Sequence, residues 1–204
     1  MSAIMRWISM DTEAGAKPGT GPQDDDTHWG QSPFSGVMTE FGAVELITKQ
    51  SFHGVLWPSR PSDRNPAIPE LLDGAQPFDN IAVMNGFVDW LHQFGAERLI
   101  FVSDNPGFDF MWMAFEFDRA GIKNPFGWSA RRIGDFWAGS IGHWRDSSGW
   151  HKYRVTPHTH NPVDDAMGNA EGLEALLRST DDWDEILKAA NLSSSGQLES
   201  GQCG

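Results

Sequence analysis

Cysteine is almost absent from this chain of 204 residues, which holds Cys203 alone, near its end. A single cysteine excludes an internal disulfide framework and a cysteine zinc site, and it indicates an intracellular setting. Long apolar runs are also missing: none reaches membrane-spanning length, and the first residues lack the pattern of a secretory signal peptide. We therefore expect a cytoplasmic protein with no membrane partner.

Positive charge is scarce as well. Lys and Arg number 15 against 28 Asp and Glu, a formal net charge of −13, which argues against a protein that coats nucleic acid without selectivity. Residues 131–154 are the exception, because they hold five cations against two Asp: Arg131, Arg132, Arg145, Lys152 and Arg154. Aromatic residues interleave with these cations. The combination suits a single nucleic-acid strand, with cations on phosphates and rings stacked on bases.

The apolar pattern predicts one α/β domain. Short apolar runs indicate four strands, at residues 5–10, 37–46, 52–57 and 99–103. The first three are expected to form an antiparallel meander, and the fourth suits the centre of a sheet.

Helical periodicity is found in four further stretches, at residues 80–94, 110–119, 130–138 and from 161 onward. Residues 14–35 and 58–78 are rich in turn-forming residues, and we expect irregular connections there.

Residues 158–173, HTHNPVDDAMGNAEGL, contain the best-defined helix start in the chain. Asn161 is the predicted N-cap and Pro162 the first helical residue, and Asp164 and Asp165 add negative charge to the first turn. This pattern fixes where the helix begins.

The spacing of His160 and Asp165 places an imidazole just outside this helix and a carboxylate one turn inside it. Asp165 falls away from the apolar stripe of the helix, on a side shared with Asn169 and Gly172. Both groups can serve one small site. The same spacing is also common where a surface loop leads into an acidic helix start, so it needs partners elsewhere in the chain.

Other carboxylates follow two of the predicted strands. Asp11 and Glu13 end the first strand, and because residues two apart project to the same side, they present like charges that repel unless a cation lies between them. Asp104 and Asp109 follow the strand at 99–103, at the sheet edge where ligands and metals bind in α/β proteins. Taken singly, each pair can also be a solvated loop entrance or a helix cap.

Three short motifs occur in order on elements of suitable type: Asp11-x-Glu13, Asn105-x-x-Phe108-Asp109 and His160-x4-Asp165. Together they resemble the three exonuclease motifs of the DnaQ-like, DEDDh family of 3′→5′ exonucleases, over residues 5–177. Residues 124–130, NPFGWSA, and the His158-Thr-His160 segment look like a subgroup of small stand-alone bacterial and phage members. The resemblance implies a ribonuclease H-like α/β fold: a mixed sheet of about five strands flanked by helices, with the site across the carboxyl ends of strands one and four.

The resemblance also implies the chemistry. Asp11, Glu13, Asp109 and Asp165 would bind two divalent cations, and His160 would be the general base. Carboxylate oxygens favour Mg²⁺ or Mn²⁺ over zinc, and two such cations can activate water and relieve charge on the leaving 3′-oxygen. An unperturbed imidazole pKa of about 6.5 suits a base at neutral pH. The expected substrate is the 3′ end of single-stranded or short RNA or DNA, with release of nucleoside 5′-monophosphates.

Three groups of residues are expected to contact substrate. Those within the motifs are Thr12, Asn105 and Phe108, and those in the basic window are Arg131, Arg132 and Arg154. In this family aromatic residues near the first motif wedge the terminal bases, and the possible equivalents here are Trp29 and Phe34. Asp104 stands where many members have His or Ala, and we expect it to stiffen its motif through a local hydrogen bond. Asp164 is expected to cap its helix, and His158 to support the site without acting as the base.

Two other functions compete with this prediction. His158-x-His160 suggests a metallo-β-lactamase-like hydrolase, but that pattern requires Asp and His where Pro162 and Val163 stand. A catalytically silent nucleic-acid-binding module on the same fold would be marked by a missing carboxylate, and all four are present.

The domain limits and the oligomeric state are further expectations. Residues 1–191 are predicted to form one domain and residues 192–204 a disordered tail. Small stand-alone members of the family are often homodimers, and the ten tryptophans of this chain are compatible with that state.

Overall fold

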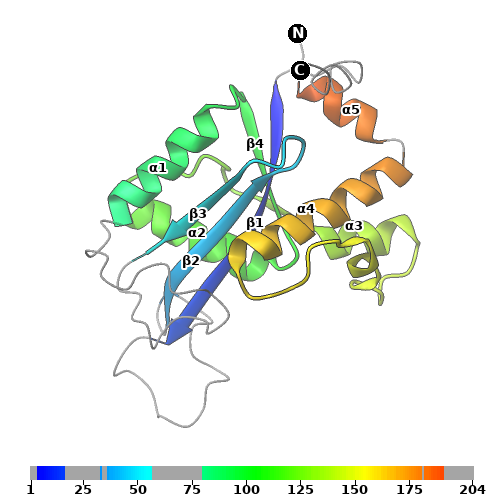
Figure 1. Ribbon diagram of the computed structural model, residues 1–204, viewed down its shortest axis with the longest axis horizontal. Coiled ribbons are helices and arrows are strands. Elements are labelled where there is room, and N and C mark those ends of the chain that lie inside the picture. Colours follow the sequence, from blue (N-terminus) through cyan, green and yellow to red (C-terminus); the bar gives the residue numbers. More distant parts are fainter. Residues whose placement is uncertain (1–3, 17–32, 34–35, 57–79, 181, 191–204) are drawn as a thin grey trace, which may run out of the picture.

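The computed structural model describes residues 4–16, 33, 36–56, 80–180 and 182–190. They form a central β-sheet covered by helices on both faces (Figure 1). The predictions made for Trp29, Phe34 and the tail after residue 191 lie outside the described residues.

The sheet is mixed and its five strands lie in the order β3-β2-β1-β4-β5. Their bounds are β1 Met5–Ala16, β2 Gly36–Glu45, β3 Ser51–Val55, β4 Arg98–Ser103 and β5 Ala130–Arg132. β1 pairs antiparallel with β2 and parallel with β4, and β2 pairs antiparallel with β3. The predicted meander and the mixed sheet are confirmed.

β1 is the strand on which the sheet centres, and both of its faces are buried. Trp7 packs into one hydrophobic layer, whereas Ile8 and Met10 pack into the other, which explains the continuous apolar run in its sequence. The strand does not end at residue 10 as predicted, because pairing with β2 continues through Ala16, with an irregularity after Glu13.

Helices form one layer on each face of the sheet (Figure 1). One layer holds α1 Asn80–His92 and α2 Pro106–Arg119. The other holds α3 Ile133–Ser140, the 3₁₀ helix η2 Gly149–Tyr153, α4 Pro162–Ser179 and α5 Asp182–Ala189. Within the described part of the chain, no helix has both the length and the apolar character needed to span a membrane.

Two predicted helix bounds are wrong. Residues 130–132 are not the start of a helix but the short strand β5, which pairs parallel with β4. α2 begins at Pro106 and not at residue 110, since a proline with its φ already set suits the first helical position.

Candidate active site

Four carboxylates from three elements meet beside the carboxyl end of β4. Asp11 and Glu13 lie on β1, Asp109 lies in the first turn of α2, and Asp165 lies in the first turn of α4. Oxygen atoms of Asp11, Glu13 and Asp165 all lie within 4.8 Å of one another. The charge of Asp109 acts on both Asp11 and Glu13. The structure thus brings together the four acids that the motifs single out.

Thr12 holds Asp109 through one carboxylate oxygen. Its Oδ1 accepts hydrogen bonds from the backbone N–H of Thr12, at 3.0 Å, and from the Thr12 hydroxyl, at 2.9 Å. Its Oδ2 is buried without a hydrogen-bond partner among the described residues. Thr12 was expected to contact substrate; in the structure it is buried and orients Asp109.

The pKa values of three of these acids are raised. Burial is the main cause for each, and neighbouring carboxylates add to it. The pKa of Asp11 lies well above its usual value, that of Glu13 rises to about 8, and that of Asp109 rises to about 7. Carboxylates so close together favour a shared cation, and the unpartnered Oδ2 of Asp109 is a hard oxygen donor of the kind that Mg²⁺ and Mn²⁺ prefer.

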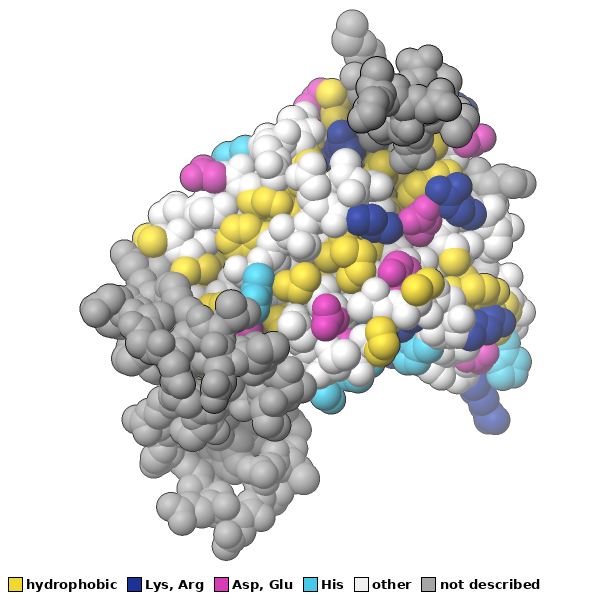
Figure 2. All heavy atoms as spheres, in the orientation of Figure 1, with side chains coloured by type: hydrophobic (Ala, Val, Ile, Leu, Met, Phe, Trp, Pro, Cys, Tyr) yellow, Lys and Arg dark blue, Asp and Glu magenta, His cyan; other side chains and the backbone are white. Residues whose placement is uncertain are grey.

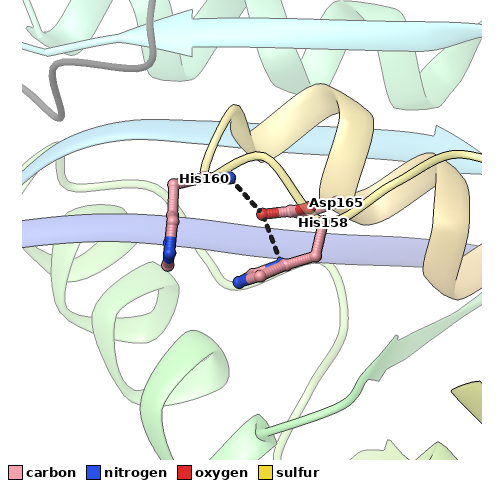
Figure 3. Close-up of side chains that lie close together, drawn as sticks. All are labelled: His158, His160 and Asp165. Carbon is pink, nitrogen blue, oxygen red and sulfur yellow. Dashed lines mark hydrogen bonds and ion pairs between the residues drawn. The ribbon is translucent and has the colours of Figure 1, made fainter.

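Asp165 is fully buried, and both of its oxygens have partners. Oδ1 accepts from Nη2 of Arg154, at 3.1 Å, and from the backbone N–H of Thr159, at 3.0 Å. Oδ2 accepts from the backbone N–H of His160, at 3.0 Å, and lies 2.8 Å from Nδ1 of His158 (Figure 3). These four contacts fix the plane of the carboxylate.

The two histidines before α4 lie on the solvent side of Asp165. Their ring centroids are 4.3 Å apart, and both side chains are more than half exposed. Nδ1 of His160 lies 3.8 Å from Oε1 of Glu13. His160 has a φ of 61°, an uncommon conformation for a residue with a side chain. His158 contacts the carboxylate directly, and His160 faces the acids on β1.

The predicted start of α4 is confirmed, and a glycine allows it to approach the sheet. The side chain of Asn161 accepts from the backbone N–H of Val163 at 3.0 Å, as an N-cap does. A Cβ atom on Gly42 of β2 would overlap the carbonyl of Pro162. Asp164 accepts from the Thr159 hydroxyl at 3.1 Å, so it steadies the preceding loop and not the helix backbone as predicted.

The side chain of Arg154 points into the molecule and does not lie on a surface where a nucleic-acid strand could bind. Its guanidinium donates to Asp165 and, at 3.2 Å, to Oδ1 of Asn169. Gly168 leaves the space that this guanidinium occupies. The sequence contains a signal for this contact, because Asp165, Asn169 and Gly172 form a polar and small-residue side of the helix, apart from its apolar stripe.

The other expected substrate residues are spread over the rim. Asn105 is exposed as the N-cap of α2, and Phe108 packs edge-on against Trp112. Arg131 and Arg132 are exposed on β5.

Asp104 does not stiffen its motif as predicted. Its carboxylate makes no hydrogen bond to another described residue, whereas its backbone carbonyl accepts from Nε of Arg132 at 3.0 Å. The charge of Asp104 still matters, because it contributes to the raised pKa of Asp109.

Sequence reasoning missed Glu40, a buried acid on β2 directly opposite Glu13. Its charge contributes to the raised pKa of Glu13, and its Oε2 lies 2.8 Å from Nε2 of His53 on β3. A glutamate within an apolar strand is a signal for such a pair, because buried acids are rarely left without a partner.

The basic and aromatic window is divided between the interior and the surface, because its cations Arg131, Arg132, Arg145 and Lys152 are exposed. Trp137 and Trp150 are buried, and Lys152 lies 4.8 Å from the Trp137 ring centroid. Trp144 remains 80% exposed. On the face drawn in Figure 2, the described acidic and basic side chains are interspersed and form no continuous basic surface.

A cavity of ≈570 Å³ lies away from these acids. It is bounded by β1, β5, α4 and α5, and its lining includes Trp7, Leu173 and Ile186. Arg131 and Arg132 also line it, whereas none of the motif carboxylates does. The four acids therefore do not belong to this apolar cavity.

Comparison of the sequence with known protein families and with curated proteins gives no match. Comparison with solved structures does: the chain is similar to the nuclease domain of 3'hExo, described as a DEDDh family member and bound to rAMP, with a TM-score of 0.59. The two are 14% identical, and the similarity covers 85% of this chain and 92% of that chain. The predicted ribonuclease H-like α/β fold is therefore confirmed.

Proposed function

We propose that this chain is a metal-dependent 3′→5′ exonuclease that hydrolyses phosphodiester bonds at the 3′ end of single-stranded or short nucleic acids. The main support is the cluster of four acids on three elements, beside an exposed imidazole, in a fold shared with a nuclease domain. That nuclease domain is described as bound to rAMP, a nucleoside monophosphate, which is the kind of product that the proposed reaction releases.

Asp11, Glu13, Asp109 and Asp165 would hold two divalent cations, Mg²⁺ or Mn²⁺. When bound, such cations supply an activated water and stabilise the leaving 3′-oxygen. The protein contributes the geometry: Thr12 fixes one oxygen of Asp109, and Arg154 and Thr159 fix one oxygen of Asp165. Oxygens that are held in place lose little conformational freedom when the cations bind.

His160 is the proposed general base. It stands at the mouth of the site, with Nδ1 3.8 Å from Glu13, and its ring is accessible to water and to a bound phosphodiester. A neutral imidazole can accept the proton of the attacking water, a role that typically contributes about 10²–10⁴-fold in rate. His158 is proposed to orient Asp165 instead, because its Nδ1 already contacts that carboxylate.

The substrate end would lie between the acids and the rim formed by Asn105, Arg131 and Arg132. Arg132 is already tied to the segment after β4 through the carbonyl of Asp104. Two exposed arginines at this rim suit contact with a few phosphates, so the enzyme would bind a few terminal nucleotides and not a long duplex.

The test uses oligomers of RNA and of DNA, labelled at either end, with Mn²⁺, Mg²⁺ or EDTA. Wild-type protein should release mononucleotides progressively from the 3′ end, only with metal, whereas Asp11→Asn should not. Asp89→Asn, an exposed acid on α1, is the matched control and should retain activity. Intact folding with no cleavage of either polymer by wild type would overturn the proposal and favour a non-catalytic binding module.

A further inference from the structure

His158, His160 and Asp165 form a second potential metal-binding group beside the four acids. One donor atom from each lies within 4.8 Å of the other two. In Figure 3 the two imidazole rings lie on the same side of the carboxylate, one from each end of a three-residue segment. The donor set is two nitrogens and one oxygen, which differs in chemistry from the all-carboxylate cluster on β1, α2 and α4.

We propose that these three residues bind a divalent transition-metal ion of the zinc type. Imidazole nitrogens favour Zn²⁺, Co²⁺, Ni²⁺ and Cu²⁺, whereas Mg²⁺ prefers oxygen ligands. Two histidines and a carboxylate, with a fourth position left for water, is a ligand set that zinc adopts in proteins.

The Asp165 carboxylate, the buried ligand of this site, is already oriented by hydrogen bonds. Arg154 and Thr159 hold Oδ1 of Asp165, so Oδ2 faces the two histidines. The backbone N–H of His160 also donates to Oδ2, at 3.0 Å, which ties the His-Thr-His segment to the carboxylate. The left-handed conformation of His160 gives the segment the bend that this contact requires.

Only small movements separate the observed geometry from coordination. Ligand atoms on a tetrahedral zinc ion with bonds of about 2.0–2.1 Å are roughly 3.3 Å apart. In the structure, the donor atoms of His158, His160 and Asp165 lie within 4.8 Å of one another. Both imidazole side chains are more than half exposed, so neither ring is enclosed by the hydrophobic core. The ion would lie beside Nδ1 of His158 and Oδ2 of Asp165, which are 2.8 Å apart and would separate slightly to admit it.

Occupation of this site has a consequence that rests on the proposed function. Zinc would hold the imidazole that acts as base and would use the Asp165 carboxylate that the catalytic cations need. The ion is therefore expected to inhibit the nuclease reaction, and added Mg²⁺ is expected to relieve the inhibition only partly, because Mg²⁺ does not compete for the two imidazoles.

Binding can be measured without nucleic acid. Metal-stripped protein is titrated with Zn²⁺ in a calorimeter with excess Mg²⁺ present, and with Co²⁺ while its visible absorption is recorded. Wild type should bind one ion, and the Co²⁺ spectrum should show nitrogen ligation. His158→Gln removes a direct ligand and should weaken the affinity by at least about 10–100-fold, the loss that is typical for an outer-shell partner. His92→Gln, at an exposed histidine on α1 in the opposite layer, should not change the affinity.

Three outcomes decide the matter. Equal affinity for wild type, His158→Gln and His160→Gln, all with the far-ultraviolet circular dichroism of the wild type, would overturn the proposal. Loss of affinity in both variants supports it, even if no nuclease activity is found. Zinc inhibition that persists unchanged in a folded His158→Gln variant would show that the inhibitory ion binds elsewhere and would overturn the regulatory part.

Discussion

Asp11, Glu13 and Asp109 are placed so that ionisation of one disfavours ionisation of the others. Burial raises their pKa values first, and the charges of nearby acids raise them further. Removing one charge should therefore favour the folded protein while it removes a metal ligand. Stability and activity are expected to change in opposite directions.

Asp11→Asn tests this directly. We expect activity to fall by more than about 100-fold, as for loss of a metal-site group, while the metal-free protein melts at a higher temperature. A gain of about 1 kcal/mol corresponds to roughly 2–4 °C for a chain of this size. Calorimetry in EDTA beside a cleavage assay measures both. A lower melting temperature than wild type would contradict the repulsion argument.

The two histidines should differ in their effect on the pH profile. His160→Gln is expected to lower kcat/KM by about 10²–10⁴-fold and to change the shape of the pH profile, because the general base is lost. His158→Gln should lower activity less and leave the shape of the profile unchanged, since its role is to orient Asp165. Cleavage rates of the two variants between pH 5.5 and 8.5 distinguish the two roles. The opposite result, with the larger effect in His158→Gln, would make His158 the base.

At the scale of secondary-structure elements, the start of α4 depends on a glycine in the neighbouring strand. A Cβ at Gly42 would overlap the carbonyl of Pro162, so Gly42→Ala must push α4 away from β2. We expect a loss of about 1–3 kcal/mol in the free energy of unfolding, with reduced activity because Asp165 and His160 move with the helix.

Gly86→Ala is the matched control. Gly86 lies within α1 with open space around its Cα, so alanine should add about 0.5–1 kcal/mol of stability through helix propensity. Urea unfolding of both variants gives the comparison. Equal stability of the two variants would show that α4 can shift without cost.

α4 is also tied to η2 through the buried contact of Arg154 with Asp165. Arg154→Met leaves a carboxylate that is 1% exposed without its cation, and removal of one partner of a buried pair typically costs about 3–5 kcal/mol. Lys188→Met breaks an exposed pair with Glu185 and should leave the melting temperature unchanged. Melting temperatures of the two variants and the wild type test this prediction. A small effect of Arg154→Met would show that water replaces the guanidinium.

For the whole molecule, the raised pKa values predict how stability varies with pH. In the metal-free folded protein Glu13 titrates at about 8 and Asp109 at about 7, against 4.5 and 3.8 ordinarily. Between those limits the folded state binds more protons than the unfolded state, so stability falls as pH rises. The melting temperature measured in EDTA should therefore fall as the pH is raised from 5 to 8.5.

Divalent cations should reverse this trend, because they bind the ionised carboxylates. The rise in melting temperature on adding Mn²⁺ is expected to be larger at pH 8.5 than at pH 5.5. Melting temperatures that increase with pH in EDTA would contradict the assignment of these acids to one buried cluster.

Most of the architecture was predictable because its signals are local. The buried runs of β1 and β4 and the Asn161-Pro162 start of α4 each lie within a few consecutive residues, and the structure has all three. The four acids could be chosen because they follow these elements at characteristic spacings.

What the sequence could not reveal depends on contacts between distant residues. β5 has three residues and no period of its own, so only pairing with β4 makes it a strand. Arg154 was assigned to phosphates because it lies in a basic window, but the space left by Gly168 directs it to Asp165. The role of Thr12 depends on a partner 97 residues away.

The brevity of β5 bears on the association of copies. An edge strand offers unpaired backbone groups to any second chain, and short or charged edges discourage such pairing. β5 spans only Ala130–Arg132, and two of its residues are exposed arginines. Side-by-side pairing of this edge with its copy would bring four guanidinium groups together. The sheet is therefore protected from growing into a fibre at this edge, and a dimer of the chain would have to use another surface.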